Sequence, residues 1–121
     1  MATDTSMGWG RGSIYGTPFC VLATSSDTST NGSEAVPAVT GQTPYVQGYQ
    51  ISSVAAITMT LSHTAAAAGK TAIGPTENMA ANTTTAPRIY PTPIAGAEGK
   101  NVGFVGSGAG AVTMLVWGYY R

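Results

Sequence analysis

The sequence predicts an all-β protein, an antiparallel sandwich or jelly roll, on three observations. Short runs of aliphatic, aromatic and β-branched residues alternate with small polar ones, and turn signals interrupt them about every 8–12 residues. No hydrophobic repeat with the period of a helix persists for two turns. No strand–helix–strand spacing appears that a parallel sheet would require. We therefore expect about eight short strands and no long helix.

The strands can be placed in order from alternation and from the positions of proline and glycine. Pro18 stands at the start of the first strand, where no donor to the ladder is needed. Asn31-Gly32 marks a turn in the loop 25–34, and the stretch 76–82 is expected to carry at most one helical turn. The predicted strands are 18–24, 35–40, 45–51, 54–63, 71–73, 88–90, 101–107 and 111–120.

The segment 54–63 has the most regular alternation. Ile57, Met59 and Leu61 fall on one face, together with His63, while hydroxyl side chains fall on the other. This is the pattern of a half-buried antiparallel strand whose apolar face lies on a core. His63 is the only histidine in the chain, and its position predicts a residue at a strand end rather than a base or a ligand.

The C-terminal segments 101–107 and 111–120 are predicted to form a β-hairpin around the glycine-rich turn 106–110. Because strand side chains alternate, the second segment presents apolar groups on both faces. One face holds Val112, Met114, Val116 and Tyr120, and the other holds Leu115, Trp117 and Tyr119. We expect a facing sheet to cover one of these faces and a neighbouring subunit or surface to cover the other.

The composition indicates one domain with an uncharged surface. Charged residues make up 8% of the 121 residues, against about 25% in an ordinary soluble domain. Five basic and five acidic residues give a net charge of zero. Such a chain is either weakly soluble or selected to sit in an assembly, and the two-faced final strand favours the assembly. Residues 18–121 are assigned to a single β-sandwich domain and residues 1–17 to a flexible N-terminal arm.

The arm carries Trp9 and Arg11 among glycines. Glycine loses the most backbone entropy on ordering, so neither a strand nor a helix is expected there. The segment is either a disordered terminus or an arm that orders on a partner. In the second case Trp9 and Arg11 would be its anchors, because tryptophan and arginine dominate interface hot spots.

No constellation of residues predicts catalysis, a cofactor or a metal site. The acidic residues stand singly in expected loops, and no serine lies in a G-x-S-x-G elbow. The segment 64–71 lacks the leading glycine and the following helix of a phosphate-binding loop. Cys20, the one cysteine, alternates with Phe19 and Val21 and is expected to be a small buried core residue. Without a basic stripe or a polybasic cluster, nucleic acid and membrane surfaces are not expected partners.

From Tyr45 onward, over roughly two-thirds of the chain, the order of features resembles small jelly-roll proteins of tailed bacteriophages that decorate or cement the capsid. Residues 1–44 carry no part of the resemblance. It rests on GYQIS at 48–52, AITMTL at 56–61, TAIGP at 71–75, the proline-bearing segment 88–93, the GKNV entry at 99–102 and VWGYY at 116–120.

Such proteins are commonly trimers that clamp neighbouring capsomers at three-fold or quasi-three-fold positions of the shell. The resemblance implies a non-enzymatic jelly-roll virion protein without a cofactor, made in the host cytoplasm and located on the outer capsid surface. Its expected partners are itself, as a homotrimer, and the major capsid protein. Trp9 and Arg11 are the expected capsid contacts, and Trp117, Tyr119 and Tyr120 are expected in the subunit interface or the core.

The alternative from another class is a receptor- or carbohydrate-binding module of a phage tail fibre or baseplate. There, exposed aromatic side chains would form a platform for sugar rings, and polar threonine and asparagine loops would form its rim. A small hydrolase has no feature of the sequence in its favour.

Overall fold

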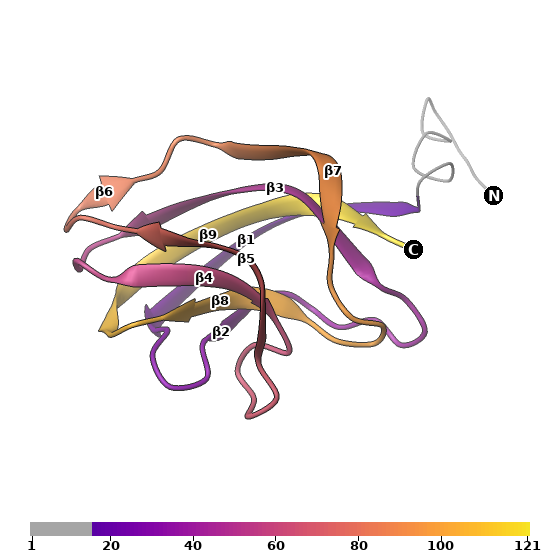
Figure 1. Cartoon of the computed structure of the whole chain (residues 1–121), viewed down its shortest axis with the longest axis horizontal. Helices are drawn as coiled ribbons and strands as arrows, with labels where there is room; N and C mark the ends of the chain where they lie inside the picture. Colours follow the sequence, from indigo (N-terminus) through magenta and orange to yellow (C-terminus); the bar gives the residue numbers. More distant parts are fainter. Residues whose placement is uncertain (1–15) are drawn as a thin grey trace.

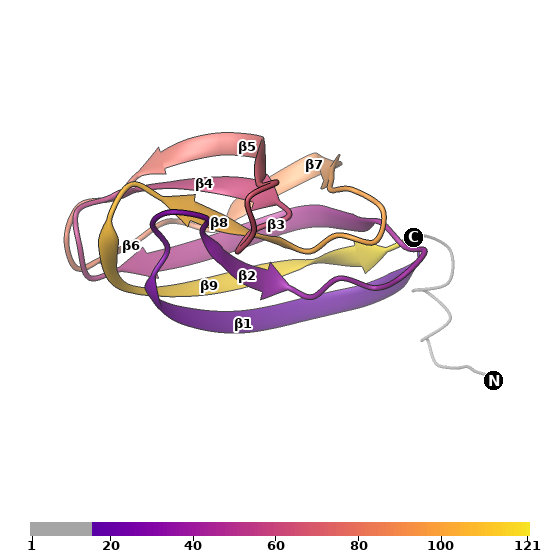
Figure 2. The ribbon, with the colours of Figure 1, turned by 90° about the horizontal axis from the view of Figure 1, so that it is seen from below.

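The computed structural model describes residues 16–121, which form two antiparallel β-sheets packed as a sandwich (Figures 1 and 2). The predicted all-β class is confirmed, with nine strands in this part of the chain rather than about eight. The same residues contain no helix, and therefore none long and apolar enough to span a membrane. All but the last two residues of the predicted arm, Trp9 and Arg11 included, lie outside the described residues.

Each sheet combines strands that are distant in sequence. The five-stranded sheet has the order β1-β9-β3-β6, and β7 also pairs with β3; the four-stranded sheet has the order β2-β8-β4-β5. The five-stranded sheet contains β1 (Thr17–Asp27), β3 (Pro44–Ser53), β6 (Thr83–Thr84), β7 (Arg88–Ala95) and β9 (Ala109–Tyr120). The four-stranded sheet contains β2 (Ser33–Val36), β4 (Thr58–His63), β5 (Thr71–Asn78) and β8 (Val102–Gly106).

The core lies between the two sheets and is filled by every second side chain of each strand, those that point toward the facing sheet. On β4, Met59 and Leu61 are fully buried, and on β9 Met114 and Val116 are too, which confirms the faces predicted for both segments. The fully buried ring of Tyr49 meets Phe104 edge-on, with ring centroids 5.1 Å apart. The cluster also includes Ala35, Val36, Val46, Ile51, Ile57, Met79, Val102, Val112 and Tyr120.

The predicted C-terminal hairpin is wrong, because β8 and β9 belong to different sheets. β8 pairs with β2 and β4, whereas β9 pairs with β1 and β3. The glycine-rich connection is held by other loops instead of closing a ladder: Gly106 N–H donates to the Thr28 carbonyl at 2.9 Å, and Ser107 N–H donates to the Thr58 carbonyl at 3.0 Å. Gly110 adopts a φ of 149°, and a Cβ at this position would collide with the side chain of Ala55. The connection therefore carries the chain across the sandwich.

The expected burial of Cys20 is also wrong, since its side chain is exposed. β1 is the outermost strand of its sheet, and only one of its faces meets the core. Phe19 and Ala23 point inward and pack against the core cluster. Cys20 has the opposite parity, so it lies on the outer face of the sheet, beside its cross-strand partner Trp117.

Two strands run through prolines that were expected to end them. β5 continues past Pro75 to Asn78, so the helical turn allowed within 76–82 does not form. β7 continues past Pro91 and Pro93 to Ala95. Both strands lie at sheet edges, where a residue without an N–H costs no ladder hydrogen bond on its free side.

Candidate interaction surface

The outer face of the five-stranded sheet, which points away from the four-stranded sheet, carries a group of apolar and aromatic side chains. They reach it because they have the parity opposite to the core residues of the same strands. Three strands that are distant in sequence, β1, β9 and β3, lie next to one another there. The outer patch, as we call this group, consists of Cys20, Leu22, Tyr45, Ile89, Leu115, Trp117 and Tyr119.

The register of the sheet aligns the outer patch into cross-strand rows. Leu22 on β1 lies opposite Leu115 on β9, and Cys20 lies opposite Trp117. On the other side of β9, Tyr45 of β3 lies opposite Tyr119. Side chains directly opposite each other across an antiparallel pair are in contact distance, so the rows form one continuous surface.

Trp117 has room on the outer face because the facing residue on β3 is a glycine. A Cβ on Gly48 would collide with the indole of Trp117 and would lie 2.5 Å from the Arg88 carbonyl oxygen. The β3 ladder shifts by one residue between Val46 and Gly48, and this β-bulge places Gly48 opposite Trp117. The tryptophan ring thus lies against the backbone of β3 and remains half-buried.

The edges of the outer patch are much more exposed than its aromatic end. Tyr45 and Tyr119 stack with ring centroids 5.2 Å apart and an interplanar angle of 12°, and Tyr119 is only 9% exposed. By contrast, Leu22 on β1 is 67% exposed and Ile89 on β7 is 70% exposed. Large apolar side chains this exposed on one sheet face are typical of a surface that another molecule covers.

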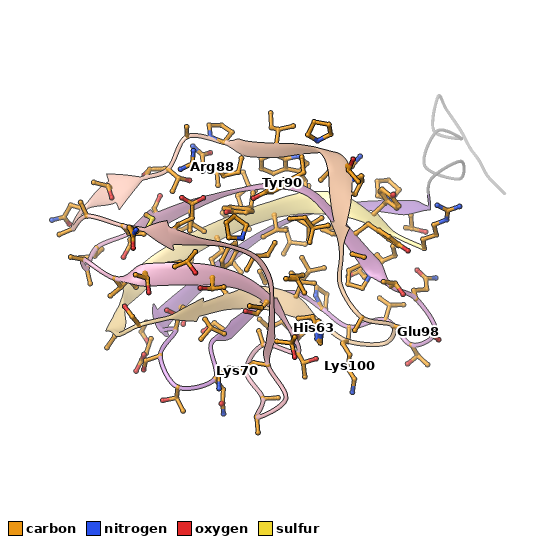
Figure 3. The ribbon with its side chains drawn as sticks, viewed as in Figure 1. His63, Lys70, Arg88, Tyr90, Glu98 and Lys100 are labelled. Atoms are coloured by element: carbon orange, nitrogen blue, oxygen red, sulfur yellow. The ribbon has the colours of Figure 1, made fainter. Side chains whose placement is uncertain are left out.

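The central part of this sheet is free of charge. None of the residues 18–24, 44–53 and 111–120, which lie in the neighbouring strands β1, β3 and β9, is Asp, Glu, Lys or Arg. The labelled charged side chains lie elsewhere: Arg88 on one side of the sandwich, and Lys70, Glu98 and Lys100 on the opposite side (Figure 3). Desolvating the outer patch therefore requires no ion to leave water, and desolvated ions are the most costly groups to bury.

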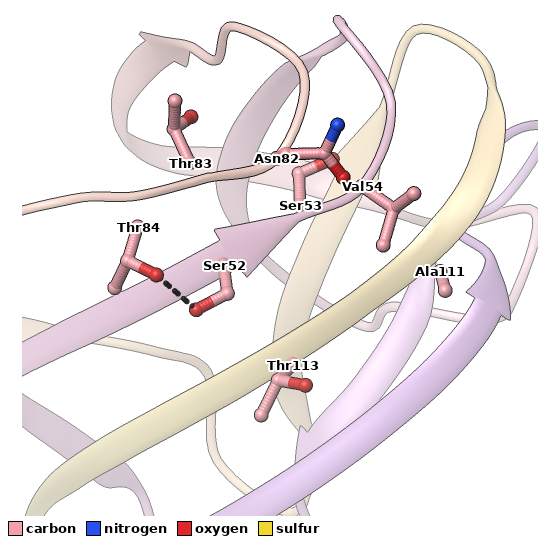
Figure 4. A pocket seen from close by; sticks show the side chains of 8 residues that line it. All are labelled: Ser52, Ser53, Val54, Asn82, Thr83, Thr84, Ala111 and Thr113. Carbon is pink, nitrogen blue, oxygen red and sulfur yellow. Dashed lines mark hydrogen bonds between the residues drawn. The ribbon is translucent and has the colours of Figure 1, made fainter.

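A shallow polar pocket of about 320 Å³ lies where β3, β6 and β9 meet (Figure 4). Its walls are neutral, and the Ser52 and Thr84 hydroxyls in it are hydrogen-bonded to each other at 2.7 Å. The pocket holds no carboxylate, imidazole or thiol, so none of these groups stands in it as a base to activate its serine and threonine hydroxyls. It is lined by Ser52, Ser53, Val54, Asn82, Thr83, Thr84, Ala111 and Thr113.

The strongest electrostatic feature joins the two sheets and lies apart from the outer patch. The Glu77 carboxylate on β5 accepts hydrogen bonds from Arg88 Nε at 2.7 Å, Arg88 Nη2 at 2.9 Å and the Tyr49 hydroxyl at 2.8 Å. The Arg88 guanidinium holds the pKa of Glu77 below its ordinary value. Burial, reinforced by the hydrogen bonds to Tyr90 and Glu77, raises the pKa of Tyr49 far above its ordinary value. This is a structural clamp, because a carboxylate held ionised in this way is a poor proton donor or acceptor near neutral pH.

The structure separates the predicted site residues into two groups. Trp117 and Tyr119 belong to the outer patch, whereas Tyr120 points into the core, 8% exposed, with its hydroxyl donating to the Pro37 carbonyl at 2.7 Å. His63 lies at the end of β4, where its Nδ1 shares a hydrogen bond of 2.8 Å with the Thr64 hydroxyl. Within residues 16–121 no three side chains of the metal-ligating types come together.

Sequence reasoning missed the contribution of β1 to this surface. The signal was present, because apolar residues occupy both parities of 18–24: Phe19 and Val21 on one face, Cys20 and Leu22 on the other. This is the same two-faced pattern that singled out the final strand. No protein-family model, curated protein or solved structure matches this chain.

Proposed function

We propose that this chain is a viral structural protein, a capsid decoration or cement protein that binds an assembled phage shell as a homotrimer. The observation that carries the proposal is the outer patch, which spans the four neighbouring strands β1, β9, β3 and β7 and contains no charged residue. A surface of this kind suits burial between protein subunits, because the centre of an interface is depleted in charge and enriched in aromatic residues.

The proposed fold within the sandwich class is the jelly roll, and the nested strand pairing supports it. If the two-residue strand β6 is left aside, the first strand pairs with the last, the second with the next to last, and so inward: β1 with β9, β2 with β8, β3 with β7 and β4 with β5. Rolling up this long double ribbon brings β3 against β9 and β4 against β8. Eight strands in two sheets with such crossings are typical of a jelly roll.

In the proposed assembly, Trp117 and Tyr119 of the outer patch lie in the contact between copies, and Tyr120 supports that contact from the core. Trp9 and Arg11 remain the proposed contacts with the major capsid protein. The mechanism is thermodynamic: a protein that binds the assembled shell but not its separated subunits stabilises the shell by mass action. The protein would act on the outer capsid surface after synthesis in the host cytoplasm, with no enzymatic step and no nucleic acid or membrane partner.

A second candidate function is a receptor- or carbohydrate-binding module of a phage tail fibre or baseplate. The neutral pocket lined by Ser52 and Thr84 favours it, because its hydroxyl and amide groups are suited to hydrogen bonds with the hydroxyls of a sugar. The two functions differ in copy number. A cement protein occupies a shell in hundreds of copies, whereas a tail protein is present in few.

Copy number and position in purified particles, measured by quantitative gel and imaging, test the proposal directly. Hundreds of copies across the shell are expected, and a handful at one vertex would transfer the assignment to the tail.

The isolated chain is expected to have a trimeric mass by light scattering. Leu115→Lys, in the middle of the outer patch, should reduce that mass to a smaller species, while Thr92→Lys on the exposed edge of β7 should leave it unchanged. An unchanged mass in Leu115→Lys would exclude the outer patch as the contact.

A further inference from the structure

The free backbone edge of β1 borders the outer patch, to which β1 contributes Cys20 and Leu22, and its properties do not depend on the proposed function. β1 is eleven residues long and stands last in its sheet, with β9 as its ladder partner (Figure 2). Within residues 16–121 no strand pairs with its other side. Over Thr17–Ser25, whose register with β9 is uninterrupted, the free side thus presents backbone N–H and C=O groups without a strand partner for about 30 Å, at roughly 3.3 Å per residue.

The other sheet edges carry the features by which proteins prevent edge pairing. β2 has only four residues and a shift of register against β8. β5 contains Pro75, and β7 contains Pro91 and Pro93. Short strands, irregular registers and prolines all discourage the addition of another strand.

β1 carries such features only near its ends: its register shift against β9 lies between Ser25 and Asp27, and Thr17–Ser25 pair with β9 without interruption. Its one proline is Pro18, next to its first residue, and its one charged residue is Asp27, at its last position. Between them, eight consecutive residues are uncharged and free of proline and glycine. A long, uncharged edge of this kind is a template for pairing with another chain.

The side chains of β1 define which strand can be added. On the inner side, Phe19 and Val21 are only half-buried, because the sheet ends beside them. On the outer side, Cys20 and Leu22 are exposed. An added strand must therefore be uncharged and must place apolar side chains on both faces. β1 itself meets this requirement, since it carries the same residues in the same alternation.

We propose that β1 pairs antiparallel with β1 of a second copy of this chain, about a two-fold axis perpendicular to the strand. Such a contact is isologous, so one surface satisfies both partners. If all eleven residues of the two strands overlap, the two copies of Leu22 lie directly opposite each other. If the two-fold axis instead passes through a residue next to Leu22, the two copies of Leu22 are still diagonal neighbours. The two five-stranded sheets then form one continuous sheet, and the half-buried Phe19 and Val21 become covered.

The test uses charge at Leu22 in the full chain. Leu22→Lys and Leu22→Glu each place two like charges together across the pair, which destabilises it. Mixing the two variants places lysine against glutamate and should restore a mixed dimer. Because Leu22 is 67% exposed, neither variant should unfold the chain, which the circular dichroism spectrum checks. Ile89→Lys is the matched control: Ile89 is 70% exposed on the same sheet face, but on β7 at the opposite edge.

Native mass spectrometry and sedimentation velocity, over a range of protein concentrations, give the readout. We expect the natural chain to show a species with twice the mass of the smallest one, in a proportion that rises with protein concentration. Each Leu22 variant alone should lose this doubling, the mixture should regain it as a Lys–Glu pair, and Ile89→Lys should keep it. Leu22 and Ile89 both belong to the outer patch, so a three-fold contact through that patch is weakened in all three variants, whereas the β1 pair is lost only in the Leu22 variants and returns in their mixture. Failure of the trimer is therefore distinguishable from failure of the β1 pair.

Three results would overturn the inference: a natural chain that never doubles, a mixture of the Leu22 variants that stays apart, or loss of doubling in Ile89→Lys. Amide exchange supplies an independent measurement. The β1 amides that do not pair with β9 should exchange rapidly in dilute protein and slowly in concentrated protein. Rapid exchange of these amides at every concentration would also contradict the proposed pair.

Discussion

Arg88 on β7 and Glu77 on β5 form a two-point ion pair that ties the edge of one sheet to the edge of the other. The Arg88 guanidinium donates from Nε and Nη2 to the two carboxylate oxygens of Glu77, at 2.7 and 2.9 Å. The same carboxylate accepts the hydroxyl of Tyr49, whose ring is fully buried in the core. The clamp thus connects the half-exposed Arg88 guanidinium to the core of the sandwich. Its contribution to the free energy of unfolding can therefore be measured by mutation.

Replacing the shared carboxylate should destabilise the fold. Glu77→Ala leaves the Tyr49 hydroxyl without its acceptor inside the protein, and an unsatisfied buried hydroxyl costs about 1–3 kcal/mol. We expect the free energy of unfolding, measured by chemical denaturation, to fall by that amount. Glu98→Ala, at an exposed loop position, is the control and should change it little. Equal effects of the two variants would show that the clamp is not stabilising.

The clamp should weaken in acid. Its hydrogen bonds with Arg88 hold the pKa of Glu77 in the folded state below its ordinary value of 4.5. A carboxyl whose pKa is lower in the folded state binds protons more readily when unfolded, so its contribution is complete above pH 4.5 and is lost as the pH falls through the folded-state pKa. The stability difference between the natural chain and Glu77→Gln should therefore shrink below pH 4.5. A difference that is constant from neutral to acid pH would contradict this.

The hydroxyl of Tyr49 should resist ionisation in base. Burial is the main reason why its pKa lies far above the ordinary value of 10, and the hydrogen bonds to Tyr90 and Glu77 add to the shift. Because the pKa is raised on folding, this group stabilises the fold fully below pH 10 and loses its contribution as the pH rises further. In an absorbance titration, Tyr49→Phe should match the natural chain in phenolate signal until unfolding, and only then show one phenolate fewer. A smaller signal before unfolding would mean that Tyr49 ionises in the native state.

Gly48 should not tolerate a side chain. A Cβ there meets the indole of Trp117 and the Arg88 carbonyl oxygen, and the second of these belongs to the backbone and cannot rotate away. Overpacking of this kind costs about 1–3 kcal/mol, so Gly48→Ala should lower the melting temperature clearly. Gly69→Ala is the matched control, because the nearest atom to its added Cβ is Thr64 Cγ2 at an ordinary 3.5 Å. If both variants melt like the natural chain, Trp117 is not held against β3 as described.

Cys20 should react in the native protein. Its side chain lies on the outer face of β1 and is exposed, so a neutral maleimide should label dilute folded protein at a rate comparable with that of the unfolded chain. Cys20→Ser supplies the blank. Labelling only after denaturant is added would return Cys20 to the core, where sequence reasoning placed it. Slower labelling at high protein concentration is expected if β1 or the outer patch becomes covered by another copy.

Alternation was a reliable guide wherever one side of a strand meets the core. The faces of 54–63 and 111–120 were predicted from residue parity alone, and Met59, Leu61, Met114 and Val116 are all fully buried. Parity could not say which strands pair. The runs on either side of the glycine-rich turn 106–110 read as a hairpin, yet β8 and β9 lie in opposite sheets because the turn is anchored to Thr28 and Thr58.

The outer patch was only half predicted for the same reason. Trp117 and Tyr119 were identified because their strand is apolar on both faces, but the partners that complete the surface, Cys20, Leu22 and Ile89, come from strands brought beside β9 and β3 by the fold. Likewise, the clamp joins Glu77 to Arg88, two isolated charges with no pattern in the sequence to pair them.

By itself, then, the sequence determined the all-β class, the parity of the main strands and the lack of charge along the central ones. These are local properties, because alternation and composition act on each strand separately. The tertiary structure decided the strand order, the side on which Cys20 lies and the edge position of β1. Those depend on which distant segments pair, and pairing is set by the packing of the whole core rather than by any one segment.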